Sequence, residues 1–143
     1  MALVLLDDHL LRDWLAEPDR SLKLAVGRLE VATTNLWYAR LCKSASAYGG
    51  GALLGSWSGE EREAVIAGLI ALSENVTVVP MIGLAWRMGQ LIRDYNGLSL
   101  LGAEAVAAAE SLDSRLLVSA LDDGPGIRNA CTALRIPYRA LKR

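Results

Sequence analysis

The chain has 143 residues, of which 52% are hydrophobic and 22% are charged. This length is typical of one domain, and the hydrophobic fraction is large enough to build a buried core, which excludes a disordered protein. Fifteen Lys and Arg residues are balanced by sixteen Asp and Glu residues, for a net charge of -1. The overall charge therefore gives no support for nucleic-acid binding. We predict a single folded domain over residues 1–143.

The cysteines and the apolar segments argue against several further classes of protein. Cys42 and Cys131 are far apart and form no Cys-x-x-Cys motif, which argues against a zinc site or a disulfide framework. We expect both to be small buried side chains. No uncharged apolar run reaches the roughly 18 residues of a membrane span, and the first residues lack the basic segment of a signal peptide. We therefore expect a cytoplasmic protein.

The first half of the chain alternates between strand and helix patterns. The opening apolar run suits a strand buried on both faces, and Val and Thr mark the second strand. Three consecutive glycines then favour a flexible segment. In chain order, the sequence predicts a strand at 2–6, helices at 9–16 and 19–28, a strand at 29–34, a helix at 36–46 and a loop at 47–52.

The second half continues the alternation. Ser58 and Glu61 form a capping box at the start of a helix. Further along the chain, Pro80 ends the strand predicted at 76–79. In chain order, the sequence predicts a helix from 58 to about Ser73, a strand at 76–79, helices at 84–95 and 102–112, a strand at 115–119, a helix from 122–126 to 134 and a strand from 136. This order predicts an α/β fold, a three-layer α/β/α sandwich around a mostly parallel sheet of about five strands.

Pairs of carboxylates follow two of the predicted strands. Asp7 and Asp8 follow the first strand, and Asp122 and Asp123 follow the strand at 115–119. Ligands of such sheets gather beyond the carboxyl ends of the strands, and carboxylates there suit a divalent cation such as Mg²⁺. A second interpretation stays open. One acid of each pair is also suited to cap the helix that follows it.

Several motifs resemble the PIN-domain family, whose members are metal-dependent ribonucleases and include toxins of bacterial toxin–antitoxin pairs. The opening Leu-Val-Leu-Leu-Asp-Asp-His-Leu-Leu resembles the family's first strand with its metal-binding Asp at Asp7. Gly-Ala-Glu-Ala-Val-Ala-Ala-Ala-Glu-Ser at 102–111, Arg-Leu-Leu-Val-Ser-Ala at 115–120 and Leu-Arg-Ile-Pro-Tyr at 134–138 are similar to its last helix and strands. The resemblance covers nearly the whole chain and implies the predicted fold.

The sequence departs from the family at the other acids that the resemblance implies. The second acid aligns with Arg40, and no Asp or Glu occurs between Val31 and Gly59. We hypothesise that Arg40 pairs with Asp7 in place of a metal ion. The third acid aligns with Gly102, although Glu104 is close enough in sequence to replace it. The fourth aligns with the residue just before Asp122 and Asp123.

Glu104 and His9 each have a simpler interpretation. An acid in the first turn of a helix is stabilised by the helix dipole without any ligand, and this applies to Glu104 if its helix begins at Gly102. His9 is the only histidine and has no Ser or Cys nucleophile pattern beside it. We expect it at the surface or at the start of a helix.

Three functions follow from these observations. The first is a degenerate PIN-like domain, a non-catalytic binding or regulatory module that needs no cofactor. The second is an active Mg²⁺- or Mn²⁺-dependent ribonuclease with Asp7, Glu104 and Asp122 as catalytic residues. Its metal ligands would be drawn from Asp7, Asp8, Glu104, Asp122 and Asp123. The third is an unrelated α/β interaction protein that binds neither metal nor nucleic acid.

The expected partners follow from composition and from the resemblance. The high apolar fraction and four tryptophans favour a homodimer, because surplus apolar surface is usually buried against a partner. The resemblance adds an antitoxin-like protein partner and an RNA substrate. No membrane association is expected.

Overall fold

Five parallel strands form the centre of the protein, in the order β3-β2-β1-β4-β5. The computed structural model describes residues 2–72 and 74–143. All four strand pairs are parallel, which confirms the predicted α/β fold. The strands are β1 (Leu3–Leu6), β2 (Glu30–Thr34), β3 (Val76–Val79), β4 (Arg115–Ser119) and β5 (Tyr138–Leu141).

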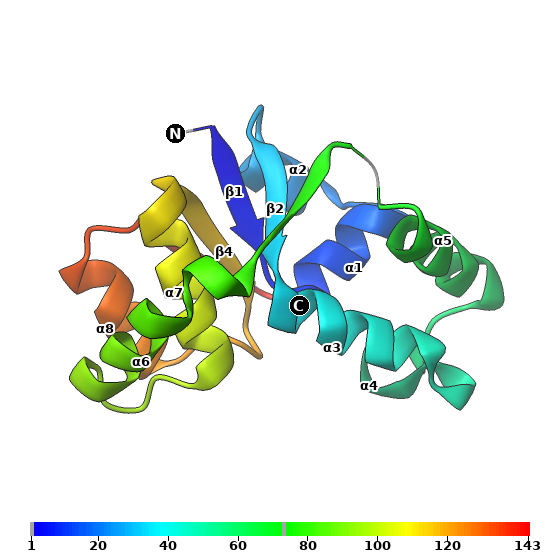
Figure 1. Ribbon diagram of the computed structural model, residues 1–143. Coiled ribbons are helices and arrows are strands. Elements are labelled where there is room, and N and C mark those ends of the chain that lie inside the picture. The colour runs from blue at the N-terminus through cyan, green and yellow to red at the C-terminus, as the bar shows by residue number, and fades with distance from the viewer. Residues whose placement is uncertain (1, 73) are drawn as a thin grey trace.

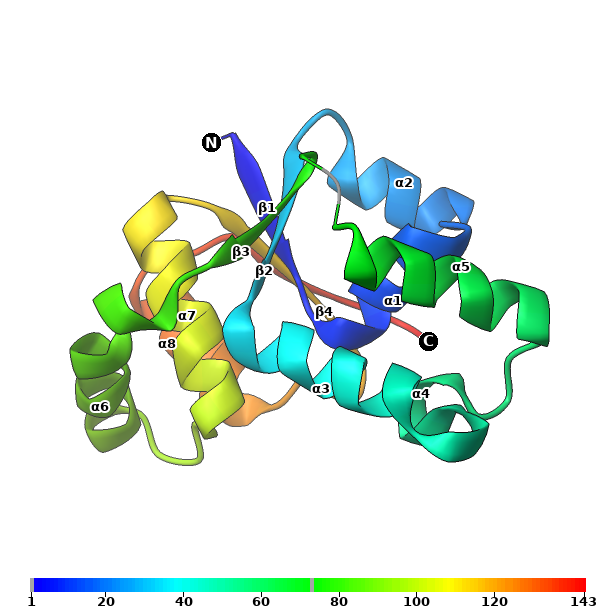
Figure 2. The same ribbon diagram turned by 45° about the vertical axis from the view of Figure 1, so that its right-hand side comes forward.

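Helices cover both faces of the sheet, so the protein is a three-layer sandwich (Figure 1). Figure 2 shows α6, α7 and α8 on one side and α1, α2, α3 and α5 on the other. The helices are α1 (Asp8–Ala16), α2 (Arg20–Val26), α3 (Asn35–Ser46), α4 (Gly51–Leu54), α5 (Gly59–Ile70), α6 (Ala85–Asp94), α7 (Leu100–Leu112) and α8 (Pro125–Ala133).

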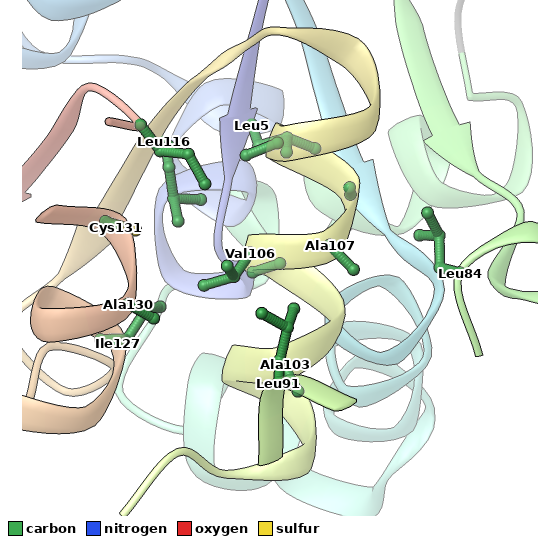
Figure 3. Close-up of a cluster of buried hydrophobic side chains, with 14 of the residues drawn as sticks. Leu5, Leu84, Leu91, Ala103, Val106, Ala107, Leu116, Ile127, Ala130 and Cys131 are labelled. Atoms are coloured by element: carbon green, nitrogen blue, oxygen red, sulfur yellow. The ribbon is translucent and has the colours of Figure 1, made fainter. Parts of the chain in front are cut away.

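Each side of the sheet has its own hydrophobic core. On one side, α7 packs its alanines into the same buried cluster as Leu5 and Leu116, and Figure 3 shows Ala103 of this helix beside Leu91 of α6. Small side chains let this helix approach the sheet closely, as the Ala-rich sequence predicts. Strands buried on both faces account for the unbroken apolar run of β1.

Local signals place most helix ends where the sequence predicts them. Ser58 and Glu61 form the predicted capping box at the start of α5. The predicted end of that helix at Ser73 lies outside the described residues, and α5 ends at Ile70. Gly97 takes a left-handed conformation with φ of 80° just after α6, as its position after a helix predicts.

Two local predictions are wrong. The glycine segment predicted as a loop forms a short 3-10 helix (Tyr48–Gly50) and then α4. Ser44 stabilises this turn, because its hydroxyl donates to the Gly50 carbonyl and accepts from the Leu53 N–H. Neither Asp122 nor Asp123 caps α8, which has Gly124 at its N-cap without a side-chain hydrogen bond.

The cysteines and tryptophans occupy mixed environments. Cys131 is buried and Cys42 is half-buried, both as free thiols. Trp37 is 1% exposed, which fits the expected core role, whereas Trp86 is 83% exposed. Across the residues that the structure describes, no helix combines the length and the apolar character needed to cross a membrane.

Candidate functional site

The candidate site lies where the order of strands reverses. β1 pairs with β2 on one side and with β4 on the other, so the chain connects outward in both directions from this point. The segments that follow β1 and β4 therefore diverge and leave room between them at the carboxyl edge of the sheet. Asp7 and Asp8 follow β1, and Asp122 follows β4.

Asp7 is fully buried and joins α1 to β4. As the N-cap of α1, it accepts a hydrogen bond from the Leu10 N–H at 2.9 Å through Oδ1. Its Oδ2 accepts from the N–H and hydroxyl of Ser119 at 2.8 and 2.6 Å. Burial and a hydrogen bond with the Asp122 carboxyl nevertheless raise the pKa of Asp7 to about 7. The capping role of Asp7 is thus confirmed.

Asp8 is also buried, and it is held as a carboxylate. Burial alone would raise its pKa, but hydrogen bonds from His9 and Arg40, together with the positive charge of Arg40, lower it to about 2. Arg40 donates from Nε to Oδ2 and from Nη2 to Oδ1, the latter at 2.9 Å. This two-point contact between guanidinium and carboxylate is the strongest hydrogen-bonding arrangement available to the pair.

Asp122, in the segment after β4, completes the site. Arg40 Nη2 lies 2.9 and 2.8 Å from its two oxygens. His9 Nδ1 lies 2.9 Å from Asp8 Oδ1 and 3.9 Å from Asp122 Oδ2. One ligand atom from each of Asp7, Asp8, His9 and Asp122 lies within 4.8 Å of the others. Three predicted acids therefore converge.

The other two predicted acids lie elsewhere. Asp123 accepts from the Tyr138 hydroxyl at 2.6 Å and from Arg128 Nη2 at 2.9 Å, which ties it to β5 and α8. The Tyr138 hydrogen bond and Arg128 lower the pKa of Asp123. It therefore acts as a link between these elements.

Glu104 is fully buried and stabilises a different helix from its own. Its Oε1 accepts from the Leu36 N–H at 2.9 Å, in the first turn of α3. Because α7 begins at Leu100, Glu104 lies beyond the first turn, and the predicted interaction with its own helix dipole is wrong. Its Oε2 has no hydrogen-bond partner among the described residues.

Two relationships in the site differ from the sequence prediction. Arg40 pairs with Asp8 and Asp122 instead of Asp7, because the oxygens of Asp7 are turned toward Leu10 and Ser119. His9 lies at the start of α1, as predicted, but its contact with Asp8 was not predicted. The only signal for it was its position next to Asp8 in the first turn of α1.

The donor set resembles that of a divalent-cation site, but its oxygens are already used. Carboxylate oxygens suit Mg²⁺ or Mn²⁺, and an imidazole suits a transition metal. Both oxygens of Asp8 and of Asp122 accept hydrogen bonds from Arg40, and both oxygens of Asp7 accept from backbone or hydroxyl groups. With Arg40 in this position, the residues do not fit a bound divalent cation.

Comparison with known proteins adds no relative: no protein-family model and no curated protein matches this chain. The PIN resemblance therefore stays a prediction from the sequence.

Proposed function

We propose that this protein is a non-catalytic, PIN-like binding or regulatory module whose acidic site is closed by its own arginine. The observation that carries the proposal is the contact of Arg40 with Asp8 and Asp122. The guanidinium supplies positive charge between two carboxylates, which is the electrostatic task of the metal ion in a metal-dependent nuclease. The fold can then keep its carboxylates without needing a cation.

Two observations support Arg40 as the residue that closes the site. The PIN resemblance implies that Arg40 takes the place of the family's second acid, and the hydrogen bond with Asp8 raises the pKa of Arg40 further above the usual value. It therefore stays charged at any pH at which the protein is folded. A metal ion entering this site would have to displace a permanent cation from two carboxylates.

An active Mg²⁺- or Mn²⁺-dependent endoribonuclease is the second candidate. The convergence of Asp7, Asp8, His9 and Asp122 favours it. It requires Arg40 to leave its carboxylates, and 39% of the Arg40 side chain is exposed, so a path to solvent exists. Metal binding is therefore the property that separates the two candidates.

The deciding experiment is a calorimetric titration of metal-free protein with Mn²⁺. We expect no saturable binding up to low millimolar Mn²⁺ for the wild-type protein. The Arg40→Glu variant restores an acid at the position that the family uses, and we expect it to bind Mn²⁺. Arg87→Gln is the matched control, because Arg87 forms a similar two-point contact with Glu110 on the surface.

Micromolar binding of Mn²⁺ by the wild-type protein, abolished by Asp8→Asn, would overturn the proposal and support the ribonuclease. Cleavage of an RNA pool in the presence of Mn²⁺ would do the same. If Arg40→Glu unfolds, the Arg40→Gln variant tests the same point without adding a negative charge.

A binding module needs a partner, and the surface favours a protein. Ile82, in the 3-10 turn just before α6, and Trp86, in the first turn of α6, are 93% and 83% exposed. We propose a second copy of the chain as one partner and an antitoxin-like protein as another. Light scattering on the wild-type protein and on Trp86→Ser tests the homodimer, which the variant should weaken.

A further inference from the structure

A cavity of about 600 Å³ adjoins the arginine-closed site. This volume lies within the range of small-molecule sites. Its walls come from the first turn of α1, from α3, from the glycine segment with α4, and from the segment after β4. It therefore opens at the carboxyl edge of the sheet where the strand order reverses, which is the usual place for ligands in open α/β sheets.

Part of the cavity wall is apolar. Ala47, Ala52, Leu53 and Leu121 line it, and Leu121 is 73% exposed. An exposed leucine beside such a hollow would gain from being covered by an apolar group. The apolar part of a ligand would therefore contact this wall.

The charged lining of the cavity includes one cation that has no charged partner among the described residues. Arg40 and Lys43 are cations, and Asp122 is the one carboxylate among the lining residues. Arg40 shares its one positive charge between Asp122 and the buried Asp8, so it is fully engaged by these two carboxylates. Lys43 is exposed, and its side chain has no ion pair or hydrogen bond among the described residues. Lys43 is thus the cation of the lining that is open to an anionic partner.

We propose that this cavity binds a small amphiphilic anion, with its acidic group paired to Lys43 and its apolar body against Leu53 and Leu121. This inference rests on the proposed function, because a site without Arg40 would present the charges of Asp8 and Asp122 to the ligand and repel it. Arg40 thus has a second effect: it makes the acidic edge of the sheet tolerant of an anion.

The test uses two probes of nearly the same shape, 1-naphthaleneacetate and its uncharged amide, titrated into the full chain by calorimetry. We expect the carboxylate to bind and Lys43→Gln to weaken it roughly two- to fivefold, which is the size of an exposed ion pair. Binding of the amide should stay unchanged in this variant. Lys23→Gln on α2 is the matched control, since Lys23 is exposed and does not line the cavity.

A second variant locates the binding. Ala52→Trp places a large side chain at an exposed position of the cavity wall and should abolish binding of both probes. Persisting binding in Ala52→Trp, equal loss of both probes in Lys43→Gln, or no binding by the wild-type protein would each overturn the inference. The Mn²⁺ titration tests the closed site separately, so a failure of one proposal is distinguishable from a failure of the other.

Discussion

Arg40 Nη2 lies 2.9 and 2.8 Å from the two carboxylate oxygens of Asp122, although the residues are 82 positions apart in the sequence. The same guanidinium also holds Asp8. One side chain of α3 therefore ties together the segments that follow β1 and β4. This contact stabilises the carboxyl edge of the sheet and determines what the site can bind.

The first prediction concerns the coupling of Arg40 to its partners. In a double-mutant cycle, Asp8→Asn with Arg40→Gln should be less destabilised than the sum of the single variants. Because 39% of the Arg40 side chain is exposed, solvent screens the pair, and we expect a coupling free energy of about 1–2 kcal/mol.

The matched cycle of Asp7→Asn with Arg40→Gln should give less than about 0.5 kcal/mol, because Asp7 makes no hydrogen bond to Arg40. Urea unfolding of the variants measures both values. A larger coupling for Asp7 than for Asp8 would contradict the arrangement described here.

The second prediction is a pH dependence caused by Asp7. Its pKa is about 7 in the folded protein against 3.8 for the unperturbed group, so between these values the folded state binds the extra proton. The free energy of unfolding should therefore fall as the pH rises from about 4 to 7, by up to about 1.4 kcal/mol per pH unit. Urea unfolding midpoints measured across this range test the slope.

Asp7→Asn should remove this slope, whatever its effect on absolute stability. Asp8 provides the contrast, because its pKa is lowered to about 2. Its contribution to stability is present above pH 4 and is lost as the pH falls toward 2. Asp8→Asn should therefore leave the slope between pH 4 and 7 unchanged. Loss of the slope in this variant would contradict its assignment to Asp7.

The third prediction concerns the structural role of Glu104. Glu104→Ala removes the acceptor of the Leu36 N–H and leaves a cavity, so we expect it to cost about 2–4 kcal/mol of unfolding free energy. Glu104→Gln keeps the acceptor and the volume, and should cost less than about 1 kcal/mol. Thermal and urea unfolding give both values. Equal losses in the two variants would show that the charge, and not the acceptor, matters.

The fourth prediction concerns the start of α8. A Cβ at Gly126 would lie 2.6 Å from the carbonyl carbon and oxygen of Gly97 and 2.7 Å from the Leu98 nitrogen. Because these are backbone atoms, Gly126→Ala should be strongly destabilising, by more than about 2 kcal/mol. Gly124→Ala is the control, since a Cβ there meets nothing within 4 Å. Similar unfolding midpoints for the two variants would refute the close contact.

The sequence by itself determined the strands, most helices and the class of fold. These depend on patterns that act over a few residues: the apolar run of β1, the capping box of α5 and an acid positioned to cap α1. Each strand buried on both faces is recognisable from its own composition. The gathering of acids at one edge of the sheet also followed, because parallel strands end at the same edge.

The tertiary structure alone decided how the site residues pair. Asp8, rather than Asp7, faces Arg40, and Asp123 turns to Tyr138, although each neighbouring pair has the same chemistry. Glu104 binds Leu36, a residue 68 positions away. These choices depend on the register of distant strands and on the direction in which each side chain leaves its backbone, and no local pattern in the sequence encodes either.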